Sequence, residues 1–233
     1  MIRRMAAKKI TIQGFLDEFL RRHEQMPDRP FCWLLGSGAS VQSGIPTGGK
    51  LAYQWLEELH KMEDFENRSI EDWATAECLE ISGFDYRNAA GFYPWIYRRR
   101  FQNSPEQGYA FLEHTMGGAE PSIGYSFLAQ IMANSNHKVA VTTNFDNLVA
   151  DALSIYASAF PLVCGHESLA GFIRSQPRRP LVAKIHRDLL LEPKNNPEDI
   201  AEMSEEWENA LKRIFEGYTP IIIGYGGNDG SLM

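Results

Sequence analysis

Five short apolar runs stand out in the pattern of hydrophobic and polar positions along the chain. Each run is apolar at nearly every position and partly β-branched, which is typical of strands buried on both faces of a parallel sheet. The predicted strands cover residues 31–36, 139–144, 160–165, 180–186 and 220–225.

Segments with helical spacing lie before and between these runs. An amphipathic helix is predicted over residues 11–24, where Ile12, Phe15, Leu16, Phe19 and Leu20 share one face. Further helices are predicted over residues 49–63, 121–134, 146–157, 167–174 and 200–216. Strands that alternate with helices indicate a Rossmann-like, doubly wound α/β fold with a mostly parallel sheet.

Residues 65–120 break this alternation. They are rich in aromatic and charged residues and contain no run typical of a buried strand. We therefore expect a mostly helical insertion beside the sheet, within a single domain that comprises residues 1–233.

Composition and charge narrow the function classes. The chain has 233 residues, of which 44% are hydrophobic, enough for one sizeable core. Its net charge of −7 disfavours direct nucleic-acid binding, which needs a basic surface. No apolar run is long enough to cross a bilayer, and the N-terminus lacks the apolar stretch of a signal peptide. We expect a soluble, cytoplasmic protein with no membrane partner.

The cysteines Cys32, Cys78 and Cys164 are widely separated and form no C-x-x-C pair. A zinc site of four cysteines cannot be built from them, so we expect free thiols and no bound metal.

The chain stops at Met233, soon after its last apolar run and without a closing helix. This predicts that it is the N-terminal part of a longer multidomain protein, or that a neighbouring segment covers the last strand. A fused C-terminal sensor domain or a partner protein would fill that place. Aromatic and arginine residues over 92–101 favour a homo-oligomer, because such residues are enriched at interfaces.

Ligands in open parallel sheets bind at the carboxyl ends of the strands, so the residues that follow the apolar runs are the candidate site residues. These are Gly36, Ser37, Gly38, Ala39 and Ser40 after the first run, Asn144 and Asp146 after the second, His186 after the fourth, and Gly224 and Asp229 after the fifth. Such residues after four independent strands predict one shared site.

The glycine-rich turn of residues 36–40 suits a pyrophosphate, because glycines let the backbone approach the phosphate oxygens. It is neither the usual dinucleotide fingerprint, since Val41 replaces the third glycine, nor a Walker A loop. A tight turn without a ligand is the alternative for Gly36-Ser37-Gly38 alone. The Gly44-Ile45-Pro46 continuation makes the motif more specific.

The run His186-Arg187-Asp188 is of the kind found in kinase catalytic loops. A kinase needs Asn five residues after this Asp to hold a metal, and that position is Pro193 here. We therefore reject the kinase hypothesis and take His186 as the functional residue of the run.

Taken in order, these motifs resemble those of the sirtuin-like, NAD-consuming family. The matching stretches are residues 36–40, Ser43-Gly44-Ile45-Pro46, Asn144-Phe145-Asp146, Lys184-Ile185-His186 and the Gly224 turn, and the resemblance spans residues 30–230. It implies that the first motif holds the NAD pyrophosphate, that the Asn-x-Asp motif contacts the nicotinamide end and its ribose, and that the histidine is the catalytic base.

The departures from the family are equally informative. Deacetylases of the family continue Gly-Ile-Pro with Asp-Phe-Arg, whereas this chain has Thr47-Gly48-Gly49, and Thr143 stands where a Gln usually precedes the Asn. Their four-cysteine zinc module is absent from the sequence. The pattern is similar to the sirtuin-like effector domains of bacterial antiphage defence proteins, which lie at the N-terminus of longer chains and hydrolyse NAD+ once infection is sensed.

The leading hypothesis is an NAD+ glycohydrolase that depletes NAD+ in antiphage defence. In this hypothesis, Asn144 holds the ribose and positions water. His186 acts as general base or accepts a hydrogen bond from a ribose hydroxyl. Asp146 would engage the carboxamide, residues 36–40 the pyrophosphate, and Gly224 and Asp229 the adenosine half. The alternatives are that Asp146 caps the following helix and that Asn144 only braces a turn. A non-catalytic NAD or ADP-ribose sensor is the second hypothesis, and a protein-lysine deacylase is disfavoured.

Overall fold

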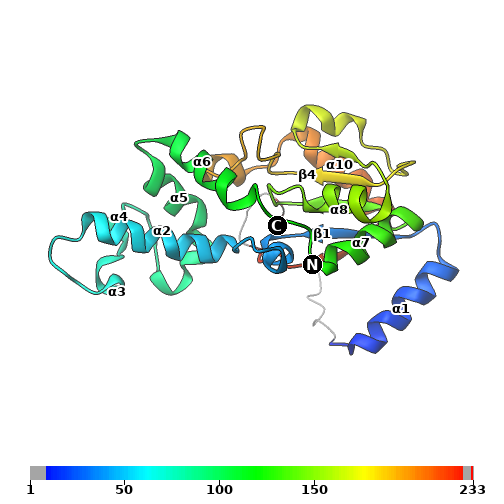
Figure 1. Cartoon of the computed structure of the whole chain (residues 1–233), viewed down its shortest axis with the longest axis horizontal. Helices are drawn as coiled ribbons and strands as arrows, with labels where there is room; N and C mark the ends of the chain where they lie inside the picture. Colours follow the sequence, from blue (N-terminus) through cyan, green and yellow to red (C-terminus); the bar gives the residue numbers. More distant parts are fainter. Residues whose placement is uncertain (1–8, 228–231, 233) are drawn as a thin grey trace, which may run out of the picture.

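Five parallel strands form the sheet at the centre of the computed structural model, which describes residues 9–227 and 232 (Figure 1). The strands are β1 Phe31–Leu35, β2 Val139–Thr142, β3 Leu162–Cys164, β4 Leu181–Lys184 and β5 Thr219–Ile223. Their order is β3-β4-β2-β1-β5, and every pair is parallel. The Rossmann-like α/β fold predicted from the apolar runs is confirmed.

The register brings the carboxyl ends of four strands to one edge. Leu35 lies opposite Thr142 on one side and Ile223 on the other, and Thr142 lies opposite Lys184. After β1, the strands β2, β3 and β4 are all added on one side of it, and the last strand, β5, is added on its other side. This change of direction creates the crevice in which ligands of doubly wound sheets bind.

Helices cover the two faces of the sheet because neighbouring strand residues point to opposite sides. On one face, Trp33 and Ala140 pack with α7 Ile123–Asn134 and α8 Leu148–Ala157. On the other face, Cys32 and Val141 pack with α10 Glu205–Gly217 and the 3₁₀-helix η3 Glu167–Phe172. The helix predicted over 167–174 is this short 3₁₀ turn, and the one predicted over 200–216 is divided into α9 Pro197–Ala201 and α10.

A separate helical lobe projects from one end of the sheet (Figure 1). Its elements are α2 Gly48–Glu63, α3 Ile70–Trp73, α4 Ala76–Leu79, η2 Tyr86–Phe92, α5 Tyr93–Phe101 and α6 Pro105–Met116. Trp55, Leu56, Trp73, Ile96 and Phe101 belong to a core of the lobe's own. The buried residues of α2 all belong to that core, so the lobe begins at α2 rather than at the predicted residue 65.

The strand β5 and the helix α1 Ile12–Gln25 differ from expectation in their burial. We predicted that the last strand would be buried on both faces, but Ile222 is 60% and Ile223 41% exposed. No residue of α1 is buried, although Phe19 stacks on Phe31 with 5.2 Å between ring centres. The prediction for β5 was wrong because apolar sequence alone cannot distinguish a central strand from a strand at the edge of the sheet.

The thiols of Cys32 and Cys164 are free, as predicted, and both are enclosed in the core. Burial raises the pKa of Cys32 to about 12 and that of Cys164 to about 11. Thiols protonated to this extent are poor nucleophiles, so both residues contribute to packing rather than to chemistry.

Candidate functional site

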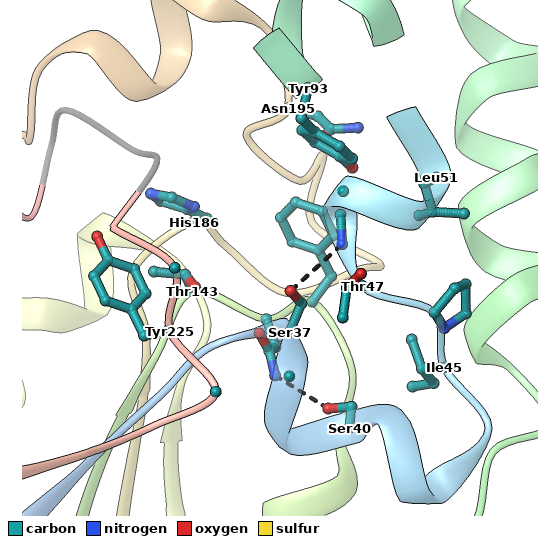
Figure 2. A pocket seen from close by; sticks show the side chains of 18 of the residues that line it. Ser37, Ser40, Ile45, Thr47, Leu51, Tyr93, Thr143, His186, Asn195 and Tyr225 are labelled. Carbon is teal, nitrogen blue, oxygen red and sulfur yellow. Dashed lines mark hydrogen bonds between the residues drawn. The ribbon is translucent and has the colours of Figure 1, made fainter. Parts of the chain in front are cut away.

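A pocket of about 350 Å³ lies at the carboxyl ends of β1, β2, β4 and β5 and extends to the helical lobe (Figure 2). The candidate residues that line it are Ser37, Gly38, Ser40, Asn144, Asp146, His186 and Gly224. Gly36 and Ala39 belong to the same turn but do not line the pocket, and Asp229 lies outside the described residues. Parallel strand topology therefore brings together residues that are up to 187 positions apart, from Ser37 to Gly224.

The glycine turns after β1 and β5 pack directly against each other. Gly36 donates its N–H to the Ile223 carbonyl at 3.0 Å, and Gly38 donates to the Gly224 carbonyl at 2.9 Å. A Cβ atom on Gly224, whose φ is +65°, would lie 2.2 Å from the Ala39 nitrogen. The close approach of two backbones explains these glycines without a ligand.

This packing also limits how the first turn can bind phosphate. The N–H groups of Gly36, Gly38 and Ala39 all donate to carbonyl oxygens of the protein. The Ser37 hydroxyl lies on the pocket side, where it accepts the Gly48 N–H at 3.4 Å (Figure 2). Pyrophosphate binding by this turn stays a prediction, and the Ser37 hydroxyl is better placed for it than those three N–H groups.

Asn144 connects the turn after β2 to the glycine turn. Its Nδ2 donates to the Gly36 carbonyl and to Ser40 Oγ, both at 3.1 Å, and its side chain is buried. The amide group thus braces a turn, as the structural alternative predicted. Since both amide protons are used, the Oδ1 oxygen is the end of the side chain that can orient a hydroxyl or a water molecule.

Asp146 continues this network. One carboxylate oxygen accepts the Ser40 hydroxyl at 2.8 Å, and the other accepts the N–H of Leu148, the first residue of α8, at 3.2 Å. Burial raises the pKa of Asp146, while these two hydrogen bonds and the nearby Lys184 charge oppose the change. The carboxylate therefore supports the start of α8, and contact with a carboxamide stays a prediction.

Lys184 was not predicted as a site residue, yet its side chain forms hydrogen bonds with the turn after β2, which carries Asn144 and Asp146. Its Nζ donates to the Phe145 carbonyl at 2.6 Å, to Asn147 Oδ1 at 2.9 Å and to Asp188 Oδ2 at 2.5 Å. The residue is 1% exposed, and this burial lowers the pKa of its ammonium, against the influence of Asp188. The sequence signal was a lysine inside an apolar strand, a position where a charge needs buried partners.

His186 lines the pocket directly after β4 and is buried. Its carbonyl accepts the N–H of Lys194 at 2.9 Å, which folds the following polar loop back over the site. Lys194 and Asn195 thereby become part of the pocket wall. The sequence did not indicate either residue as part of the site, because the return of the loop depends on a tertiary hydrogen bond.

Comparisons with known proteins do not assign a function to the site. No protein-family model matches the chain, and no curated protein matches its sequence. In residues 9–227 and 232, no three His, Cys, Asp or Glu side chains gather in a way that could hold a metal ion. Within those residues, too, every helix is too short or too polar to cross a membrane.

Proposed function

We propose that the protein is an NAD+ glycohydrolase, which cleaves NAD+ to nicotinamide and ADP-ribose. The observation that carries the proposal is the convergence of Asn144, His186 and the two glycine turns on one pocket at the switch point of the sheet. This is the place where doubly wound folds bind dinucleotides. The likeness of these motifs to those of the sirtuin-like family supports the same substrate.

The chemistry required is hydrolysis of an N-glycosidic bond. The bond between C1′ of the ribose and the pyridinium nitrogen breaks, and its electron pair leaves with nicotinamide, which becomes neutral. The ribose develops oxocarbenium character, as in other glycoside hydrolyses. The oxygen of a water molecule then bonds to C1′, and the water gives up one proton.

Two side chains suit these steps. His186 would accept the proton, since an imidazole titrates close to neutral pH when it is unperturbed. Asn144 would use its Oδ1 oxygen to orient the water or a ribose hydroxyl, because its Nδ2 protons are already donated. Asp146 and Ser40 would hold Asn144 in place through the hydrogen bonds that join the three residues.

The pocket lining favours the departure of the leaving group. Ile45, Pro46, Leu51, Pro94, Met116 and Ile200 supply apolar walls. Transfer into apolar surroundings costs a charged pyridinium more free energy than it costs neutral nicotinamide. Enclosure of the pyridinium ring would therefore promote cleavage.

The test compares turnover with binding. His186→Ala is expected to lower the rate of nicotinamide release by about 10² to 10⁴-fold while NAD+ affinity, measured by calorimetry, changes little. Asn144→Ala is expected to lower turnover as well. His114→Ala serves as the control, since His114 is exposed on α6. Unchanged turnover in His186→Ala, or loss of binding together with a collapsed melting temperature, would remove His186 from the mechanism.

The same measurements separate the alternative functions. Tight NAD+ or ADP-ribose binding without nicotinamide release from the assembled protein would identify a sensor. Deacetylation of a lysine peptide panel would identify the disfavoured deacylase.

The biological role that we propose with this activity is NAD+ depletion in antiphage defence. The protein would act as a homo-oligomer, together with a fused sensor domain or a partner protein. The exposed isoleucines of β5 support a covering partner, because such apolar surface is often an interaction site. Cells that express the protein should lose NAD+ after phage infection, and unchanged NAD+ would count against this role.

A further inference from the structure

The side chain of Asn195 is buried without a hydrogen bond of standard geometry. The residue is 3% exposed and lines the pocket, and neither Nδ2 nor Oδ1 forms such a bond in the described part of the chain. The hydroxyls of Tyr93 and Tyr97 lie near the amide, which opposes the rise in their pKa that burial causes, but neither hydroxyl satisfies the amide with a well-directed hydrogen bond. A buried amide that forms no hydrogen bond destabilises a folded protein, so native structures rarely retain one without a reason. Because this amide borders a cavity, a ligand can supply the partners that the protein does not.

The position of Asn195 differs from that of the Asn144 network. In Figure 2, Asn195 lies beside Tyr93 of the helical lobe, at the end of the pocket away from Ser40. The Tyr93 ring packs over the start of α2, where a Cβ atom on Gly48 would lie 3.3 Å from the ring. This end of the pocket is therefore bounded by an aromatic ring and by the loop that follows His186.

The unmatched amide has one donor end and one acceptor end. A primary carboxamide has the same two ends and can pair with it through two hydrogen bonds. The nicotinamide ring carries such a group, and its flat, weakly polar ring suits a pocket lined by Leu51, Pro94 and Ile200. Asp146 is less suited to this contact, because an ionised carboxylate accepts hydrogen bonds but has none to donate to the carboxamide oxygen, and each of its oxygens already accepts one within the protein.

We propose that Asn195 recognises the carboxamide of nicotinamide, and that the leaving group occupies the end of the pocket between the helical lobe and the loop after His186. This inference rests on the proposed NAD+ glycohydrolase activity. It makes Asn195 a determinant of specificity for the pyridine carboxamide, and it leaves binding of the ADP-ribose part to the sheet side of the pocket.

The experiment measures the two product ligands separately. Nicotinamide and ADP-ribose are titrated by calorimetry into the wild type, Asn195→Leu and Asn195→Asp, with Asn103→Leu as the control at an exposed position of the lobe. In Asn195→Leu, nicotinamide affinity should fall about 10-fold or more, because two hydrogen bonds are lost, while ADP-ribose affinity stays unchanged. In Asn195→Asp, which keeps the shape but loses the amide donor, nicotinamide affinity should also fall.

A melting curve distinguishes recognition from a structural role. Removal of an unmatched buried amide should leave the melting temperature of Asn195→Leu unchanged or raise it, whereas removal of a structural asparagine would lower it. Turnover gives a further reading. The wild type should prefer NAD+ to its 3-acetylpyridine analogue, in which a methyl group replaces the amide nitrogen, and Asn195→Leu should lose that preference.

The outcomes separate this inference from the proposed function. Wild-type nicotinamide release with unchanged nicotinamide affinity in Asn195→Leu overturns the inference and leaves the function standing. Equal losses of nicotinamide and ADP-ribose affinity, or a lowered melting temperature in both variants, also overturn it. A wild type that binds nicotinamide through Asn195 but does not cleave NAD+ refutes the function and retains the recognition site. A wild type that does not bind nicotinamide refutes the inference.

Discussion

Replacement of Lys184 by methionine tests how the site is supported from inside the sheet. The variant keeps the length of the side chain but removes an ammonium group that donates three hydrogen bonds of 2.5 to 2.9 Å. It leaves the Phe145 carbonyl without this donor and Asp188, whose side chain is only 14% exposed, without its cation. Breaking a buried ion pair by removing one partner costs about 3 to 5 kcal/mol. We expect the free energy of unfolding to fall by this amount.

Urea unfolding, followed by far-UV circular dichroism, measures the loss. Lys212→Met is the matched control, because Lys212 is exposed on α10, and it should change stability by less than about 0.5 kcal/mol. The double variant Lys184→Met/Asp188→Asn removes the uncompensated carboxylate but keeps an oxygen that can accept the Leu190 N–H. It should recover about 1 to 2 kcal/mol relative to Lys184→Met alone.

Two results would refute this reasoning. A loss below about 1 kcal/mol in Lys184→Met would mean that removing the ammonium group from water costs nearly as much free energy as its ion pair and hydrogen bonds contribute. Additive effects in the double variant would mean that Lys184 and Asp188 do not act as a pair. If the pair does hold the turn after β2, Lys184→Met should also slow nicotinamide release, whereas Lys212→Met should not.

Two further predictions concern stability. Burial, with smaller effects of His23 and Arg22, lowers the pKa of His137 from 6.5 to about 4, and its Nδ1 accepts the Phe31 N–H. The unfolded chain therefore binds more protons between pH 4 and 6.5, so stability should rise with pH across this window, and His137→Asn, studied by urea unfolding at several pH values, should flatten the slope. Gly224→Ala should destabilise by at least about 3 kcal/mol, since a left-handed φ and a backbone overlap add together, whereas Gly118→Ala, with open space around its Cβ, should melt like the wild type. An equally steep slope in the first case, or a normal melting curve for Gly224→Ala, would contradict these expectations.

Much of the fold follows from the sequence because local patterns carry the relevant physics. A strand buried on both faces must be apolar at nearly every position, so the five runs predicted the five strands with boundaries that differ by one or two residues. Parallel strands that alternate with helices place their carboxyl ends at one edge. That rule predicted the meeting of Ser37, Asn144, His186 and Gly224 at one pocket, without knowledge of any distance.

Tertiary structure decided the features that depend on what lies next to each residue. Apolar sequence could not show that β5 is an exposed edge strand or that α2 packs into the lobe, because burial depends on strand order and on neighbouring elements. The partners of Lys184 come from two different turns, and Asn195 lines the pocket next to Lys194, whose N–H donates to the His186 carbonyl. The sequence shows which side chains need hydrogen-bond partners once they are buried. Only the folded chain determines whether the protein supplies those partners or leaves them to a ligand.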